Sequence, residues 1–257
     1  MNRTTELEDR TPGRARRPLV IIAVLAVVAV AAVAAVYVAF FTDDAPERLT
    51  LADDPATTAP ATGGGGNTAT TAASGADLVG TWRVVSGSEA GYRVREKLAA
   101  LPAQSDAVGR SPAVTGTVRV DRTGGSLVAT EANFEVDLTQ LRSDESRRDN
   151  RLRTDGLQTN QFPRATFVST RPIQLPPQIT SGQVVRDIPA EGDLTVHGVT
   201  RRVTLPLEVR VSGNRGELAG SHTFPMSDFN INPPNIAGFV TVEPEATLEF
   251  KLVLEKA

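Results

Sequence analysis

Residues 78–257 predict an all-β fold, an antiparallel barrel or sandwich, and two observations indicate it. Apolar residues fall on alternate positions in almost every run of this region, which is the period of strands with one buried face. About nine such runs follow one another, with turn-forming residues roughly every 8–14 positions and nothing that resembles a strand–helix–strand unit. This pattern is typical of antiparallel barrels and sandwiches.

The clearest strand lies at residues 203–211, where every odd position is apolar and polar residues or proline stand between them. A shorter run at 193–196 precedes it, and the residues from His197 to Thr200 connect the two. Gly198 can adopt the positive φ that a tight turn requires. These residues therefore predict a β-hairpin, to which the other strands of the domain must be added.

The remaining strands show the same alternation over shorter runs. They are predicted at residues 81–88, 90–98, 114–122, 128–138, 165–173, 184–188, 216–224 and 246–254. Residues 99–112 and 228–237 contain proline with little periodicity, so the sequence predicts loops there.

Helix signals occur together in one polar segment, residues 143–153. Ser143 is placed as the N-cap, acidic residues fill the first turn, and arginines favour the C-terminal end. We expect a short helix that covers one end of the sheet as a lid. In this arrangement Leu152 packs inward, while Arg148 and Asp149 pair locally.

The N-terminal part of the chain has a different character. Residues 1–18 form a polar leader, and residues 19–41 are an uncharged apolar run of 23 residues, long enough to cross a bilayer as a helix. The three arginines at 14, 16 and 17 predict a cytoplasmic N terminus, with everything after the span outside. A cleaved signal peptide is the alternative, although its apolar region is usually only about 7–15 residues long.

Residues 42–77 are rich in Thr, Ala, Pro and Gly and are acidic, so the sequence predicts a flexible linker there. The whole chain carries a net charge of −3, and the charges of residues 78–257 balance. A neutral domain argues against a nucleic-acid partner. The chain has no cysteine, which excludes disulfides and thiol catalysis.

The two histidines do not form a recognisable site. His197 and His222 lack the spacings of metal ligands, and we predict no metal and no cofactor. Ser221 and His222 are neighbours on a strand, so their side chains point to opposite faces and cannot form a catalytic pair. For His197, a structural role in the turn and a contact with a ligand both remain open. The sequence therefore predicts a protein that is not an enzyme.

The inward positions of the predicted strands are instead apolar, and they suggest a lumen. The candidate ligand-binding residues are Trp82, Phe134, Phe167, His197, Leu205, Leu207, Phe250 and Leu252. These side chains either fill an ordinary core or line a cavity, because a barrel of about eight strands is close to the width that holds one small ligand. Apolar walls with few charges would suit a hydrocarbon chain.

Three segments, in order, resemble the YceI-like domain family of bacterial envelope proteins. They are Trp82 in GTWRV; Arg148, Asp149, Leu152, Pro163, Phe167 and Ser169; and Gly192, Leu194, Thr195, His197, Gly198, Val199, Thr200, Arg201 and Val203. The resemblance covers residues 79–255 and implies a lipocalin-like antiparallel barrel. It also implies that the lumen binds a polyisoprenoid or an isoprenoid quinone-like lipid, without catalysis.

Together these features predict a single-pass membrane protein of the cell envelope, with residues 78–257 forming a YceI-like barrel outside the cytoplasmic membrane. The barrel would hold a long apolar ligand for storage or transport. The alternative is a structural or interaction module of the envelope whose barrel is filled by side chains.

Overall fold

A computed structural model describes residues 45–53, 78–98, 104–233, 235–236 and 240–257. Among these residues, no helix is long and apolar enough to cross a membrane. The predicted leader (1–18), the predicted span (19–41) and most of the predicted linker lie outside the described ranges.

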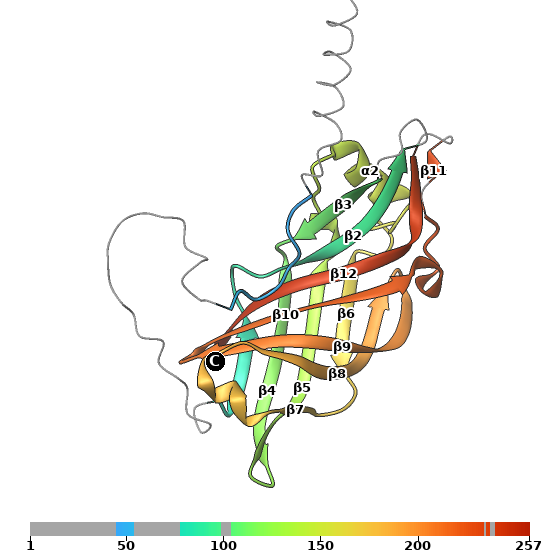
Figure 1. Cartoon of the computed structure of the whole chain (residues 1–257). Coiled ribbons are helices and arrows are strands. Elements are labelled where there is room, and N and C mark those ends of the chain that lie inside the picture. The colour runs from blue at the N-terminus through green and yellow to red at the C-terminus, as the bar shows by residue number, and fades with distance from the viewer. Residues whose placement is uncertain (1–44, 54–77, 99–103, 234, 237–239) are drawn as a thin grey trace, which may run out of the picture. The chain divides into compact units, whose positions relative to one another are not determined.

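The domain is a barrel in which strands follow the order β1-β4-β5-β6-β8-β9-β10-β12, and the pairing of β1 with β12 closes this ring of eight (Figure 1). Every pairing is antiparallel, as the sequence predicted. The strands of the ring are β1 Gly80–Val84, β4 Val114–Thr123, β5 Ser126–Asp137, β6 Arg164–Ser169, β8 Val185–Val196, β9 Val199–Ser212, β10 Arg215–Pro225 and β12 Val240–Lys256. Further strands are β2 Glu89–Leu98, β3 Gln104–Ser111, β7 Ile173–Leu175 and β11 Asn235–Ile236.

Alternation along the strands places the core inside the ring. On β9 the buried residues Val203, Leu205 and Leu207 alternate with exposed polar residues and proline, as the sequence predicted. The hairpin that joins β8 to β9 has a two-residue turn, with φ values of 51° at His197 and 72° at Gly198. Positive φ at both positions matches the turn type that favours right-handed strand twist.

The strand β3 was not predicted, because residues 99–112 lack alternation. Its sequence is mostly polar, and the apolar Ala107 and Val108 are adjacent. It nevertheless pairs with β2 along its whole length, from Ala90↔Ser111 to Lys97↔Gln104. Tertiary pairing has therefore overridden weak local preference, as is common for strands.

Three other elements differ from the prediction. The run predicted at 165–173 is divided into β6 and β7, which pair with different stretches of β5. The weak strand at 184–188 and the run at 193–196 are one strand, β8, with an irregular register between Val185 and Ile188. The loop predicted at 228–237 includes the short β11, and it begins within a 3₁₀ turn, η4 Met226–Phe229. Similar turns occur at η2 Leu138–Gln140 and η3 Pro177–Ser181.

The predicted lid helix exists as α2 Ser146–Thr154 and lies at the opposite end of the barrel from β7 (Figure 1). Its N-cap is Glu145 and not Ser143. The buried Asp149 carboxylate instead accepts hydrogen bonds from the Ser143 backbone N–H at 3.0 Å and from its hydroxyl at 2.7 Å. Arg148 pairs with Glu96 of β2, so the predicted pair of Arg148 with Asp149 is wrong.

Residues 45–53, which we call the strap, correct the prediction of a flexible linker. They run in an extended conformation along the outside of the barrel, with Leu49 and Leu51 6% and 1% exposed. The two buried leucines alternate with the exposed Thr50 and Ala52, so one side of the strap packs against the protein. The sequence did not reveal this, because two leucines in a polar stretch carry no periodicity.

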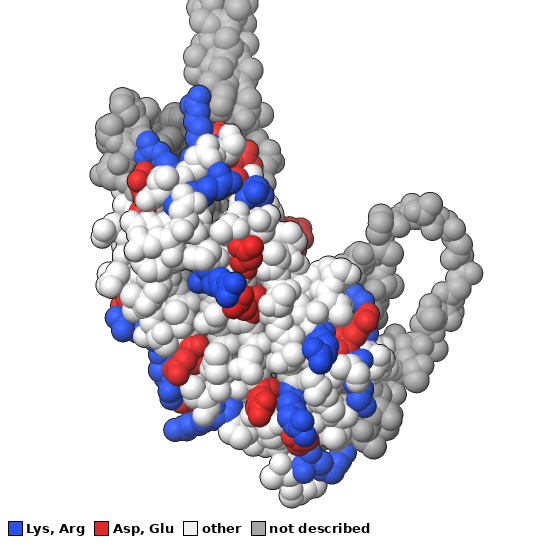
Figure 2. All heavy atoms as spheres, turned by 180° about the vertical axis from the view of Figure 1, so that it is seen from behind, with Lys and Arg blue, Asp and Glu red and all other residues white. Residues whose placement is uncertain are grey.

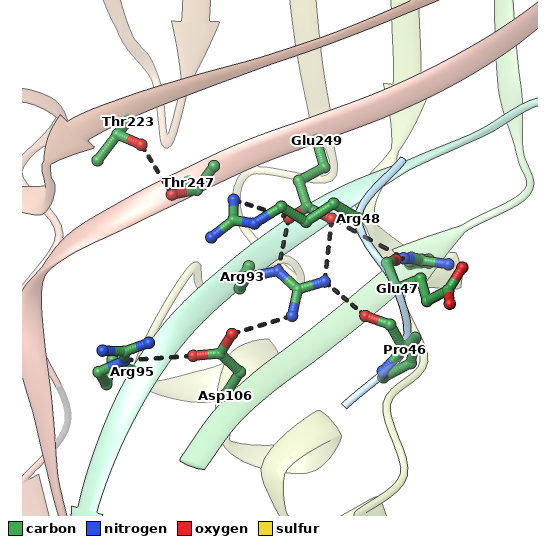
Figure 3. A network of polar contacts seen from close by, with 10 residues as sticks. Pro46, Glu47, Arg48, Arg93, Arg95, Asp106, Thr223, Thr247 and Glu249 are labelled. Atoms are coloured by element: carbon green, nitrogen blue, oxygen red, sulfur yellow. Dashed lines mark hydrogen bonds and ion pairs between the residues drawn. The ribbon is translucent and has the colours of Figure 1, made fainter. Parts of the chain in front are cut away.

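Polar contacts hold the strap at both ends, and Figure 3 shows those at its start. At its start, the Pro46 carbonyl accepts a hydrogen bond of 2.6 Å from Arg93 of β2, whose guanidinium also pairs with the buried Glu249 of β12. At its end, the Leu51 N–H donates to Glu208 of β9 at 2.7 Å, and Arg210 donates to the Ala52 carbonyl. Because β12 and β10 lie between β2 and β9 in the sheet, the strap passes over them.

Candidate functional site

The interior of the ring contains a cavity of about 150 Å³, which we call the lumen cavity. Its walls come from all eight strands of the ring and from β2, β7 and η3. Within the described part of the chain, Thr166 and Glu217 are the lining residues with polar side chains. Glu217 is paired with Arg210, and the Trp82 indole N–H donates to the Leu78 carbonyl at 2.9 Å, so the surface offered to a ligand is apolar.

The structure brings most of the predicted site residues together. The residues that line the lumen cavity are Trp82, Phe134, Phe167, Leu205, Leu207, Phe250 and Leu252. They come from five strands of the ring, β1, β5, β6, β9 and β12, and all but the half-buried Phe134 are buried. The alternation rule therefore placed these seven side chains on the correct face.

The eighth predicted residue, His197, lies in the β8–β9 turn and away from the lumen cavity. It is not among the described residues that line either cavity, and its ring ties the β8–β9 turn to two loops. Its Nδ1 lies 3.1 Å from the Phe229 carbonyl oxygen and its Nε2 lies 3.2 Å from Gln158 Oε1. Phe162 packs edge-on against the ring, with 4.5 Å between centroids. The structural role that the sequence left open is the one that these contacts support.

Small side chains explain why the lumen is not full. The buried alanines that line it are Ala90, Ala129, Ala132, Ala165 and Ala190. In a barrel of eight strands, large residues at these positions would fill the interior. The register of β5 shifts around Thr130, which keeps both Ala129 and Ala132 on the inner face. Only large side chains were predicted to line the lumen, and these alanines were missed, because alternation assigns a residue to the inner face without showing what stands opposite it.

A second cavity of about 120 Å³, the lid cavity, lies under α2. Leu152 and Leu157 from the helical segment line it, together with Met226 and Ile231 from the region of η4. Ala90, Val136, Ala165 and Leu248 line both cavities. The two spaces therefore adjoin one another and form an elongated interior that extends from the end with η3 to the end with α2.

The wall of the lid cavity includes an ion pair and a tyrosine hydroxyl. Glu96 of β2 and Arg148 of α2 form an ion pair of 3.2 Å. The Tyr92 hydroxyl is buried and has no hydrogen-bond partner among the described residues. Burial raises the pKa of Tyr92 above its usual value, so the hydroxyl stays protonated at neutral pH.

Beyond the two cavities, the features of the described residues that bear on function are possible metal ligands, histidine contacts and surface charge. They contain no group of three or more His, Cys, Asp or Glu side chains that could hold a metal ion. His222 stacks on Phe224 with 6.1 Å between ring centroids, and burial lowers its pKa. On the face shown in Figure 2, basic and acidic side chains are interspersed.

Comparisons with known proteins agree with this architecture. A model of the YceI-like domain matches residues 82–254. A UPF0312 protein of Vibrio vulnificus strain YJ016 is 29% identical over 142 residues, which is 52% of this chain and 70% of that protein. A UPF0312 protein of Vibrio parahaemolyticus is 29% identical over 125 residues, or 46% of this chain and 62% of the relative.

A solved structure shares the fold. It is a polyisoprenoid binding domain from Saccharophagus degradans, implicated in plant cell wall breakdown. The match has a TM-score of 0.53 and 16% identity, and covers 68% of this chain and 98% of that domain. At this identity the similarity concerns the fold.

Proposed function

Because the chain belongs to the YceI-like domain family, we propose that its barrel binds the apolar chain of a lipid within the lumen cavity. The observation that supports the proposal is the cavity itself, which is lined almost entirely by apolar residues where a filled barrel would have a close-packed core. A dry apolar cavity of about 150 Å³ in another protein is large enough to bind benzene. The adjoining lid cavity adds length, which favours a chain-like ligand over a compact one.

A polyisoprenoid or an isoprenoid quinone-like lipid fits this interior best. The fold is shared with a polyisoprenoid binding domain, and an isoprenoid tail is uncharged, flexible and branched by methyl groups. Removing such a tail from water contributes roughly 25 cal/mol per Å² of buried apolar surface. Over several isoprene units this contribution outweighs the cost of immobilising the chain. The protein would store or transport the lipid without altering it.

The first test is whether lipid accompanies the protein and depends on the lumen. We expect native mass spectrometry of the full chain, purified from its own host, to show a bound apolar molecule. The change Leu207→Trp enlarges a lining side chain, so it should give a folded protein without the lipid. The matched control is Val168→Trp on β6, because Val168 is 45% exposed and should accept the same side chain without affecting binding.

The alternative, a structural module with a filled barrel, predicts a different result. There the wild type would carry no lipid, and Leu207→Trp would overpack the core and lower the free energy of unfolding by about 1–3 kcal/mol. That pair of observations would contradict the binding proposal.

We also propose that residues 19–41 anchor the chain in the cytoplasmic membrane and that the barrel works on the outer side. The support is the uncharged run and its preceding arginines. Protease added to spheroplasts should then remove the barrel, and the protein in the membrane should retain its first residues. A protected barrel, or a mature N terminus near residue 40, would contradict this location.

A further inference from the structure

Three buried side-chain atoms lack a hydrogen-bond partner among the described residues: the Tyr92 hydroxyl, Arg110 Nε and the Thr159 hydroxyl. Of these three residues, only Tyr92 belongs to the described lining of a cavity. The Tyr92 side chain forms part of the wall of the lid cavity, and its hydroxyl is buried without a hydrogen-bond partner among the residues that the structure describes. Buried polar groups in proteins are nearly always paired, because an unpaired donor loses its bonds to water without replacement. A buried hydroxyl without a protein partner, in the wall of a cavity, indicates a partner that comes from a ligand.

The Tyr92 ring is held in place by the strands beneath it. Tyr92 on β2 stands opposite Gly109 on β3. A Cβ atom at Gly109 would collide with the tyrosine ring, so the absence of a side chain at that position lets the ring lie across β3. The packing of the ring across Gly109 therefore gives the Tyr92 hydroxyl a defined position beside the lid cavity.

The charges around this hydroxyl limit the kind of ligand head that fits. Among the described lining residues of the lid cavity, Glu96 and Arg148 are the charged ones, and they pair with each other at 3.2 Å. Arg148 also pairs with Asp144. The guanidinium is thus already neutralised by carboxylates, and an anionic head would have to displace one of them.

We propose that the lid cavity holds the polar head of the lipid, and that the Tyr92 hydroxyl donates a hydrogen bond to an uncharged acceptor on that head, a carbonyl or hydroxyl oxygen. This inference rests on the proposed function, because the tail of the same molecule occupies the lumen cavity. The walls of the lid cavity are otherwise apolar, apart from the paired Glu96 and Arg148, so they accept an uncharged head and disfavour a phosphate.

The test measures equilibrium binding of three probes to the full chain in detergent. Geranylgeranylacetone has an isoprenoid tail with a ketone head, squalene is a hydrocarbon without a head, and geranylgeranyl diphosphate has the same tail with a charged head. We expect the wild type to prefer the ketone over the other two. Tyr92→Phe removes only the hydroxyl, so it should weaken the ketone roughly three- to tenfold and leave squalene unchanged.

Thr159→Val provides the matched control. The Thr159 hydroxyl is also buried and unpaired within the described part of the chain, but Thr159 does not belong to the described lining of either cavity. Its removal should leave binding of all three probes unchanged. Unchanged squalene binding by Tyr92→Phe also reports that this variant is folded. If it does not fold, Gly109→Ala should displace the ring and reduce ketone binding selectively.

Two outcomes would overturn the inference while the proposed function survives. One is a wild type that binds squalene and the ketone equally, with no effect of Tyr92→Phe. The other is tighter binding of the diphosphate than of the ketone, which would assign the head site to Arg148 acting on an anion. A wild type that binds none of the three probes would instead contradict the proposed function, and the head site with it.

Discussion

At the scale of single residues, the β8–β9 turn shows how backbone conformation and a neighbouring side chain together restrict which residue a position can accept. Gly198 has φ 72°, and a Cβ atom built there would lie 2.7 Å from the Phe162 ring. A side chain at Gly198 therefore meets two penalties, one from the left-handed backbone and one from the collision. His197 shares the positive φ and is kept there by its hydrogen bonds to Phe229 and Gln158.

Gly198→Val should therefore destabilise the protein more than Gly213→Val. Gly213 has a similar φ of 55°, but nothing lies within 4 Å of the Cβ that it would gain. The Gly213 variant measures the backbone penalty alone, about 1–2 kcal/mol, and the Gly198 variant adds the collision with Phe162. Chemical denaturation of both variants gives the comparison. Equal losses of unfolding free energy would show that Phe162 moves aside and that only φ matters.

Residues of the site could be predicted only where their side chains are large. The seven predicted aromatic and leucine residues that line the lumen cavity follow from alternation, because strand period fixes the face of every side chain once the strand is located. The alanines that leave the space, and the Tyr92 hydroxyl that lacks a partner, depend on what stands opposite them across the barrel. That information lies in long-range register, which a single sequence does not reveal.

At the scale of elements, the strands that could be predicted from the sequence are those with one buried and one exposed face. Strands β9 and β12 alternate over most of their length, because one face of each packs in the core, and both were predicted. In β3, the buried apolar residues Ala107 and Val108 are adjacent and do not alternate, so the pairing with β2 defines the strand. The helix α2 was predicted from its charges and is capped locally by Glu145, but the partner of Arg148 is Glu96 of β2, which is distant in sequence.

At the scale of the whole molecule, the described domain begins with the strap at residue 45 and not at residue 78. The strap covers a buried ion pair, in which Arg93 Nε lies 2.6 Å from Glu249 Oε1 and both side chains are at most 6% exposed (Figure 3). Arg93 is also bonded to Asp106 and to the Pro46 carbonyl, so its charge is well satisfied in place. The strap carbonyl at Pro46 is therefore one of the groups that satisfy this buried charge.

We therefore expect Leu51→Ala in the full chain to lower the free energy of unfolding by about 2 kcal/mol, as for a buried leucine elsewhere. The loss cannot exceed what the strap contributes, because the strap can detach locally while the barrel stays folded. Thr50→Ala is the matched control, since Thr50 is exposed between the two buried leucines and should change the stability by less than about 0.5 kcal/mol. Urea denaturation followed by tryptophan fluorescence measures both variants, because Trp82 is buried in the barrel. Equal stabilities of the Leu51 and Thr50 variants would mean that the strap is a tether that rests on the barrel without stabilising it.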